Sequence, residues 1–127
     1  MRIISGNYKG KKILLPKDKL TRPLKDLTKE SIFNIVKHSK LLNVKIEESN
    51  ILDLFSGVGS FGLECLSRGA ANVTFLESYK EVLIILKKNI DNLKQQSYSN
   101  IIQKDIFSED TLKGLNDKFD IIFMDPP

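Results

Sequence analysis

The sequence predicts an α/β fold of the Rossmann-like type, in which helices cover both faces of a parallel sheet. Two observations support this prediction. After about residue 46, apolar strand-like runs alternate with helical segments, and the first run leads into a glycine-rich turn, Gly57-x-Gly59-x-x-Gly62. Such a turn lets the backbone approach a nucleotide-like ligand at the carboxyl edge of a parallel sheet. We expect residues 46–127 to form this domain, preceded by a small extension of residues 1–45.

The extension is expected to contain a hairpin, a loop and a helix. Residues 2–5 can pair with residues 12–15, and residues 16–23 follow as a loop. Asp26 or Thr28 is expected to cap the helix. Its apolar positions are Ile32, Phe33, Ile35 and Val36.

The larger unit is expected to contain four strands. The last one is apolar nearly throughout, which is typical of a strand that is covered on both faces. Here it would be an uncovered edge and a template for aggregation. We therefore expect the chain to be a carboxyl-truncated part of a longer protein. The expected strands are residues 51–55, 72–77, 101–104 and 119–124.

Helices are expected to connect these strands. One begins near Gly59, directly after the glycine turn. A capping box at residues 78–81 opens a second helix that extends to about Leu93. Ser108 is expected to cap a short third helix that ends near Gly114.

Charge is distributed unevenly along the chain. The formal net charge is +4, yet residues 1–40 hold eleven Lys or Arg against three acids, and the later residues hold nine against thirteen. A basic lobe suits a protein that binds a phosphate backbone, because Lys and Arg release counterions there. A solvated face is the simpler alternative. The candidate RNA-binding residues flank hairpin and loop positions: Arg2, Lys9, Lys11, Lys12 and Arg22.

Composition narrows the class of protein further. The single cysteine, Cys65, excludes an internal disulfide and is expected to be buried. No apolar run is long enough to span a membrane, and the amino terminus lacks the apolar core of a signal peptide, so we expect a cytoplasmic protein. No cluster of Cys, His and carboxylates has metal-site spacing. The single histidine, His38, is expected to have a surface or packing role.

The glycine turn by itself leaves the ligand open. Glu77, about twenty residues after Gly57, completes a dinucleotide-binding pattern, and a turn without any ligand would look the same. Asp53 favours a different ligand, because an acid inside a strand end costs stability unless it has a partner. The ammonium group of S-adenosylmethionine would be such a partner.

The second motif, Asp125-Pro126-Pro127, follows the last expected strand. Prolines fix the backbone here, so that the Asp125 carboxylate and the Pro126 carbonyl can accept both N–H bonds of one amine. The lone pair of a nucleobase or amide nitrogen is delocalised, and two acceptors favour the pyramidal form in which it faces a methyl donor. Positioning then supplies much of the barrier reduction. A strand-terminating Pro-Pro with a capping aspartate is the simpler alternative.

Together, these motifs resemble those of class I S-adenosylmethionine-dependent methyltransferases of the amino type. More narrowly, the chain resembles the bacterial family that methylates N2 of guanine 966 in 16S ribosomal RNA. The narrower resemblance rests on Thr21-Arg22-Pro23 and on the segment from Glu30 to Asn34, which general methyltransferases lack. Leu24 and Leu27 depart from the family pattern, where a threonine and a basic residue are usual. The family motif also continues with an aromatic residue after Pro127, in a sheet of about seven strands.

The resemblance implies S-adenosylmethionine as the cofactor and 16S ribosomal RNA, or the assembling small ribosomal subunit, as the partner. It implies a monomer when the chain is complete. Glu77 is expected to accept the ribose hydroxyls, whereas Asp105 and Ile106 would contact the adenine, with a helix cap as the alternative for Asp105. The other expected cofactor-binding residues are Asp53, Ser56, Gly57 and Gly59, and the catalytic residues are Asp125, Pro126 and Pro127.

Three other functions remain open at this point. A methyltransferase of adenine N6 or of a protein amide could use the same Asp125 motif. A nicotinamide-binding enzyme would need Glu77 but neither Asp53 nor Asp125. A catalytically inactive RNA-binding or assembly remnant is the third possibility.

Overall fold

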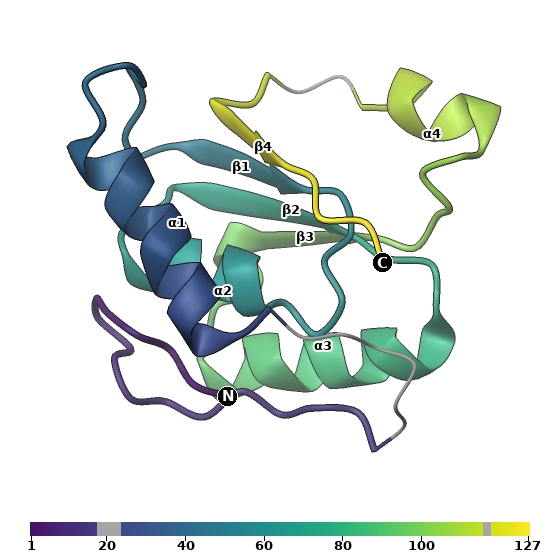
Figure 1. The fold of residues 1–127 in the computed structure, drawn as a ribbon. Helices are drawn as coiled ribbons and strands as arrows, with labels where there is room; N and C mark the ends of the chain where they lie inside the picture. The colour runs from purple at the N-terminus through teal and green to yellow at the C-terminus, as the bar shows by residue number, and fades with distance from the viewer. Residues whose placement is uncertain (18–23, 116–117) are drawn as a thin grey trace.

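The computed structural model describes residues 1–17, 24–115 and 118–127. Four parallel strands form one sheet in the order β3-β2-β1-β4 (Figure 1). The strand order reverses between β1 and β4, because the chain adds β2 and β3 on one side of β1 and β4 on the other. In open α/β sheets, ligands bind at such a switch point, outside the carboxyl ends of the strands. The bounds are β1 (Asn50–Asp53), β2 (Asn72–Leu76), β3 (Ser99–Ile102) and β4 (Ile121–Phe123).

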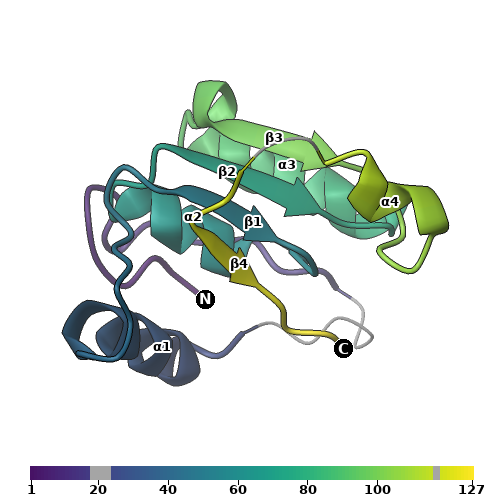
Figure 2. The same ribbon diagram turned by 90° about the horizontal axis from the view of Figure 1, so that it is seen from above.

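Helices pack mainly against one face of this sheet. Figures 1 and 2 show α1, α2 and α3 on one face and α4 near the other. Apolar residues three and four positions apart put one stripe of α3 against the sheet, and its buried members include Val82, Leu86 and Ile90. The bounds are α1 (Asp26–His38), α2 (Ser60–Ser67), α3 (Lys80–Asn92), the 3₁₀ turn η1 (Gln96–Tyr98) and α4 (Glu109–Lys113).

The two faces of the sheet carry cores of different size. The face beneath α1, α2 and α3 holds the main cluster of buried apolar side chains, including Ile51, Val73 and Phe75. It also contains Cys65, which is buried as expected. The opposite face holds a small cluster built on Leu52, Leu54 and Leu76. Most of the buried apolar core therefore lies on the face of the sheet that α1, α2 and α3 cover.

The amino-terminal extension is part of the main core, since Ile3, Ile13 and Phe33 belong to the same buried cluster. The Asn89 side chain in α3 fixes it there. Its Oδ1 accepts the N–H of Leu14 at 2.8 Å, and its Nδ2 donates to the carbonyls of Leu14 (3.1 Å) and Val58 (2.9 Å). One side chain thus ties the extension to the glycine turn.

A buried ion pair forms a second anchor. The Lys29 ammonium lies 3.3 Å from Glu64 Oε1 and donates to the Arg2 carbonyl at 2.8 Å, and both side chains are fully buried. Glu64 also accepts the backbone N–H groups of Ile4 and Ser5. Burial lowers the pKa of Lys29, and the nearby Glu64 carboxylate opposes that shift. Removing either partner would leave an uncompensated charge in the core.

Several element boundaries differ from the predicted ones. Strands β1, β2 and β4 are shorter than predicted, whereas β3 has the predicted length but begins earlier, at Ser99. Within the extension, the expected hairpin is reduced to one antiparallel bridge between Arg2 and Lys12. The predicted caps of the first helix are wrong, because α1 has Lys25 at its N-cap and no side-chain capping bond.

The predicted capping box at residues 78–81 is also wrong. The N-cap of α3 is Tyr79, again without a capping bond from its own side chain. Glu77 takes that role, since its Oε1 accepts the N–H groups of Ser78 (3.0 Å) and Tyr79 (3.1 Å). By contrast, Ser108 does take the N-cap position of α4, without a side-chain capping bond, and α4 ends next to Gly114 as predicted. His38 is exposed at the end of α1, also as predicted.

Within the described sheet, β4 is an edge strand, as the sequence suggested. Ile122 and Met124 are 57% and 64% exposed, whereas Ile121 and Phe123 pack against the main core. Its outward side is apolar and uncovered, which is the feature that promotes association of edge strands.

Candidate active site

A cleft of about 810 Å³ lies at the carboxyl edge of the sheet. A smaller inner pocket of about 50 Å³ adjoins it, and Leu24, Phe55, Gly57 and Asp125 line both spaces. Asp53 lines the inner pocket only. The cleft therefore coincides with the switch point between β1 and β4.

The glycine turn supplies one wall of this cleft. Gly57 and Gly59 have positive φ angles of 54° and 94°, a region that side chains other than glycine rarely adopt. A Cβ at Gly57 would meet nothing within 4 Å, so its backbone faces open space where a ligand can approach. Gly59 lines neither space, and a Cβ there would lie 2.6 Å from Cδ1 of Leu86, so this glycine allows close packing against α3. Gly62 also serves packing, because a Cβ there would lie 2.3 Å from Cε1 of Phe75. It allows α2 to pack closely on the sheet.

Asp53 ends β1 and is buried, with 1% of its surface exposed. Neither carboxylate oxygen has a hydrogen-bond partner among the described residues. Burial, together with the smaller effect of the Glu77 and Asp125 charges, raises its pKa to about 7. The nearby N–H of Gly62 offsets part of this shift without reaching hydrogen-bond geometry. A buried carboxylate without a donor is costly, so this site is built for a cation or donor from outside the chain.

Glu77 directly follows β2 and lines the cleft. Besides capping α3, its Oε2 accepts the N–H of Gly57 at 2.9 Å. Three backbone donors thus fix the carboxylate against the glycine turn. The Ser56 hydroxyl and N–H both donate to the Leu76 carbonyl at 3.1 Å, so Ser56 holds the turn against β2 and lines the inner pocket.

Asp105 and Ile106 line the cleft after β3. Oδ1 of Asp105 accepts the N–H of Phe107 at 2.9 Å, and its carbonyl accepts the Thr111 hydroxyl in α4. Asp105 therefore stabilises the turn into α4 and also faces the cleft. The two interpretations of this residue are compatible.

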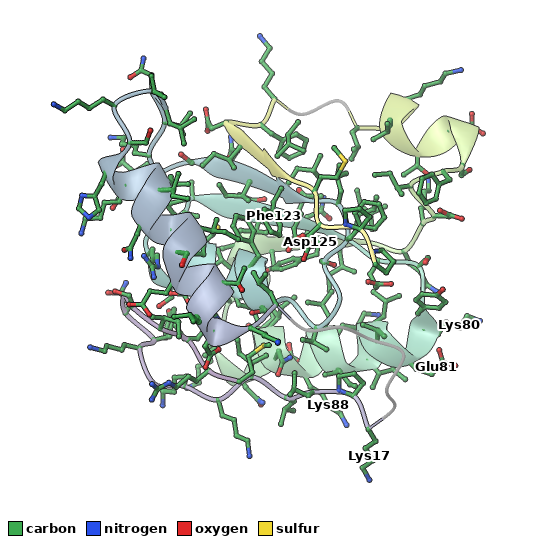
Figure 3. The ribbon with its side chains drawn as sticks, in the orientation of Figure 1. Lys17, Lys80, Glu81, Lys88, Phe123 and Asp125 are labelled. Atoms are coloured by element: carbon green, nitrogen blue, oxygen red, sulfur yellow. The ribbon has the colours of Figure 1, made fainter. Side chains whose placement is uncertain are left out.

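Asp125, Pro126 and Pro127 line the cleft from the end of β4. Asp125 is exposed, in contrast to Asp53. The strand that leads to it is held in place by an aromatic stack, since the rings of Phe123 and Phe61 lie 3.8 Å apart between centroids at 11°. Figure 3 shows Phe123 and Asp125 close together at this edge of the sheet.

The whole chain, residues 1–127, matches the family described as conserved hypothetical protein 95. The chain belongs to this family. A curated relative from Haemophilus influenzae, named Ribosomal RNA small subunit methyltransferase D, is 39% identical over 100% of this chain and 63% of the relative. The protein of the same name from Escherichia coli is 35% identical over 100% of this chain and 60% of its own length. The chain thus spans less than two thirds of these relatives.

Solved structures give the same fold. A putative methyltransferase from Escherichia coli matches with a TM-score of 0.77 at 31% identity, covering 100% of this chain and 64% of that one. A putative methylase from Haemophilus influenzae matches with a TM-score of 0.71 at 39% identity, covering 99% and 64%. The fold is therefore the Rossmann-like fold of class I methyltransferases.

The four expected RNA-binding residues that the structure describes do not line this cleft. Arg2, Lys9, Lys11 and Lys12 are exposed on the amino-terminal segment. That segment packs on the ends of α2 and α3, where the Tyr8 N–H donates to Ser67 Oγ at 3.0 Å. Arg22 lies outside the described residues.

Other lining residues were not foreseen. Tyr79 and Phe107 are exposed aromatics, and Lys25, Thr28 and Lys104 add polar groups. Tyr79 and Phe107 could have been predicted to line the cleft, because each follows an expected cofactor-binding residue, Glu77 or Asp105, by two positions. No local pattern indicated Lys25 or Thr28, because their placement depends on how α1 packs.

Two features are absent from the described residues. They contain no helix both long and apolar enough to cross a bilayer. Nor do they bring together three or more His, Cys, Asp or Glu side chains in a way that would hold a metal ion.

Proposed function

We propose that the protein is an S-adenosylmethionine-dependent methyltransferase that modifies an exocyclic amine of ribosomal RNA. The target proposed is N2 of guanine 966 in 16S ribosomal RNA, reached in the RNA or in the assembling small subunit. The names of the curated relatives support an rRNA substrate of the small subunit. Such a substrate would place the protein in the cytoplasm.

The observation that carries the proposal is the unpaired, buried carboxylate of Asp53 beside an open glycine turn. The residues fit the cofactor. Asp53 would hold its ammonium group, Gly57 would allow the backbone to approach it, and Glu77 would accept ribose hydroxyls. Asp105 and Ile106 would contact the adenine at the far end of the cleft. The bound cofactor would supply a methyl group on a sulfonium centre that carries its own leaving group.

The acceptor end would work by orientation. The Asp125 carboxylate and the Pro126 carbonyl would accept the two N–H bonds of the guanine amine, and Pro127 would keep that carbonyl in place. The Phe123–Phe61 stack fixes the strand that carries Asp125. Holding both reactants in line supplies much of the rate enhancement. The base must leave its stack to reach this pocket, at a cost of a few kcal/mol.

The test uses the full chain with methyl-labelled S-adenosylmethionine and small-subunit rRNA, free or in assembling subunits. Nuclease digestion and mass spectrometry should then locate label on N2 of a single guanine. Label on adenine N6 or on a ribosomal protein amide would redirect the substrate assignment to the alternatives that the same motif allows. Tighter binding of a nicotinamide dinucleotide than of S-adenosylmethionine would contradict the cofactor assignment.

A further inference from the structure

The cleft is lined by carboxylates that an RNA strand must approach. Glu77, Asp105 and Asp125 line it, and Asp53 lies in the inner pocket. The cations that line it are Lys25 and Lys104, among the residues that the structure describes. Charges repel a polyanion over a Debye length of about 10 Å at 0.1 M salt. An RNA strand therefore enters most favourably beside one of these two lysines.

The two lysines serve opposite ends of the cleft. Lys104 precedes Asp105 at the end of β3, and β3 and β4 are opposite edges of the sheet. Three strand spacings of about 4.8 Å separate these edges by roughly 14 Å. Leu24, by contrast, lines the same small inner pocket as Asp125. Its neighbour Lys25 is therefore the cation on the acceptor side.

Lys25 is available for an anion. Its side chain is exposed, and the ion pairs found in the described part of the chain both involve Glu64. Thr28, three residues later, lines the cleft with it and adds a neutral hydroxyl donor.

We propose that Lys25 binds a backbone phosphate of the RNA next to the target base, with Thr28 as a supporting donor. This inference rests on the proposed RNA substrate. A lysine ammonium suits a phosphate as a compact point charge that needs no bidentate geometry. The amino-terminal extension would then form one wall of the acceptor site through α1, in addition to the basic segment around residues 9–12 at the other end of α2.

The test measures anisotropy of a labelled single-stranded RNA oligonucleotide containing the target guanine, bound to the full chain with saturating S-adenosylhomocysteine. Lys25→Ala should weaken binding about tenfold and reduce the salt slope by about one, because one phosphate contact is lost. Thr28→Val should weaken it about threefold, and Lys25→Arg should retain most of the affinity. Lys37→Ala is the matched control, since Lys37 is exposed on the last turn of α1 and does not line the cleft.

A second measurement identifies the phosphate. One phosphate flanking the guanine at a time is replaced by a neutral methylphosphonate. The unmodified protein should lose affinity at one position, and Lys25→Ala should lose none there. Equal binding by Lys25→Ala and Lys37→Ala would overturn the proposal. An equal methylphosphonate penalty in the unmodified protein and in Lys25→Ala would overturn it as well. RNA binding without methyl transfer would refute the proposed function but not the Lys25 contact, whereas no RNA binding would refute both.

Discussion

The central strand β1 and the edge strand β4 are neighbours, and each has an aspartate at or just after its carboxyl end. The two carboxylates differ in how far they are buried. Asp53 is paired in register with Phe123, two residues before Asp125. Asp53 is buried without a hydrogen-bond partner, and its pKa is raised to about 7. Asp125 is exposed at the mouth of the same inner pocket.

The difference shows that position in the sheet decides what a carboxylate can do. β1 is covered on both sides by neighbours, so its terminal side chain loses water and needs an external cation. β4 has a neighbour on one side in the described sheet, so Asp125 keeps contact with solvent and with an incoming substrate. We therefore propose that Asp53 binds the cofactor and that Asp125 binds the amine.

The largest effect is expected from Asp53→Asn. Loss of the carboxylate should weaken S-adenosylmethionine binding about 100-fold or more, since the ammonium would be left without its counter-charge. The free protein should become more stable at pH 8, because an uncharged amide no longer has to be buried as an anion. Calorimetry gives the affinity and urea unfolding gives the stability. Unchanged affinity in this variant would remove Asp53 from the cofactor site.

Asp125→Asn should reverse that pattern. Methyl transfer should fall about 100-fold or more, because the charged carboxylate acceptor for the amine is replaced by a neutral amide, which accepts more weakly and can present its NH2 group instead. Cofactor affinity should change less than about twofold, since Asp125 lies on the acceptor side. Single-turnover kinetics with saturating cofactor measures the first effect and calorimetry the second. A loss of cofactor binding as large as in Asp53→Asn would erase the distinction between the two aspartates.

The affinity for S-adenosylmethionine should depend on pH through Asp53. The raised pKa of Asp53 means that it binds a proton below about pH 7, and that proton competes with the cofactor ammonium. Affinity for S-adenosylmethionine should fall about tenfold between pH 8 and pH 6, and the Asp53→Asn variant should show no such dependence. A flat profile for the unmodified protein would show that Asp53 is ionised across this range.

The stability of the free protein should change with pH in the opposite direction to the cofactor affinity. The pKa of Asp53 is higher in the folded chain than its ordinary value of 3.8, so its stabilising contribution is complete below that value and is lost as the pH rises to about 7. The loss is of the order of a few kcal/mol. The advantage of Asp53→Asn over the unmodified protein should therefore grow between pH 5 and pH 8. A stability difference between Asp53→Asn and the unmodified protein that does not change with pH would contradict this prediction, and packing would be its cause.

The smallest effect is expected on the outer side of β4. Ile122→Lys should change the free energy of unfolding by less than about 0.5 kcal/mol, because Ile122 is 57% exposed. It should reduce dye binding and self-association of the 127-residue chain. Ile51→Lys on the central strand is the contrasting variant, and it should prevent folding because Ile51 is fully buried. Equal behaviour of the two variants would contradict the edge position of β4.

Much of this arrangement could be predicted from the sequence. A continuous apolar run followed by Gly57 and Gly59 identified β1 and its turn, and the acid at its end, Asp53, was recognisable as out of place. Asp125 directly follows a second apolar run, residues 119–124, and this position indicated the carboxyl end of another strand in the same sheet. Parallel strands bring such ends to one edge regardless of their separation in the chain.

The remaining features depend on tertiary packing and have no local signal. Lys29 and Glu64 pair across 35 positions of sequence, and Asn89 reaches Leu14 across 75. The capping of α3 was misassigned because the helix begins one residue later than the pattern at residues 78–81 indicates, with Tyr79 at the N-cap, and Glu77 accepts the N–H groups of Ser78 and Tyr79. Lys25 became a candidate site residue only through the placement of α1.

The most direct test of the cofactor assignment is a calorimetric comparison of S-adenosylmethionine with 5′-methylthioadenosine, which lacks the ammonium-bearing part. The full chain at pH 8 should bind S-adenosylmethionine about 100-fold more tightly, because only that ligand satisfies the buried Asp53 carboxylate. Asp53→Asn should bind the two with similar affinity, and Asp125→Asn should keep the full preference. Equal binding of both ligands by the unmodified protein, or a preference that survives in Asp53→Asn, would contradict the account.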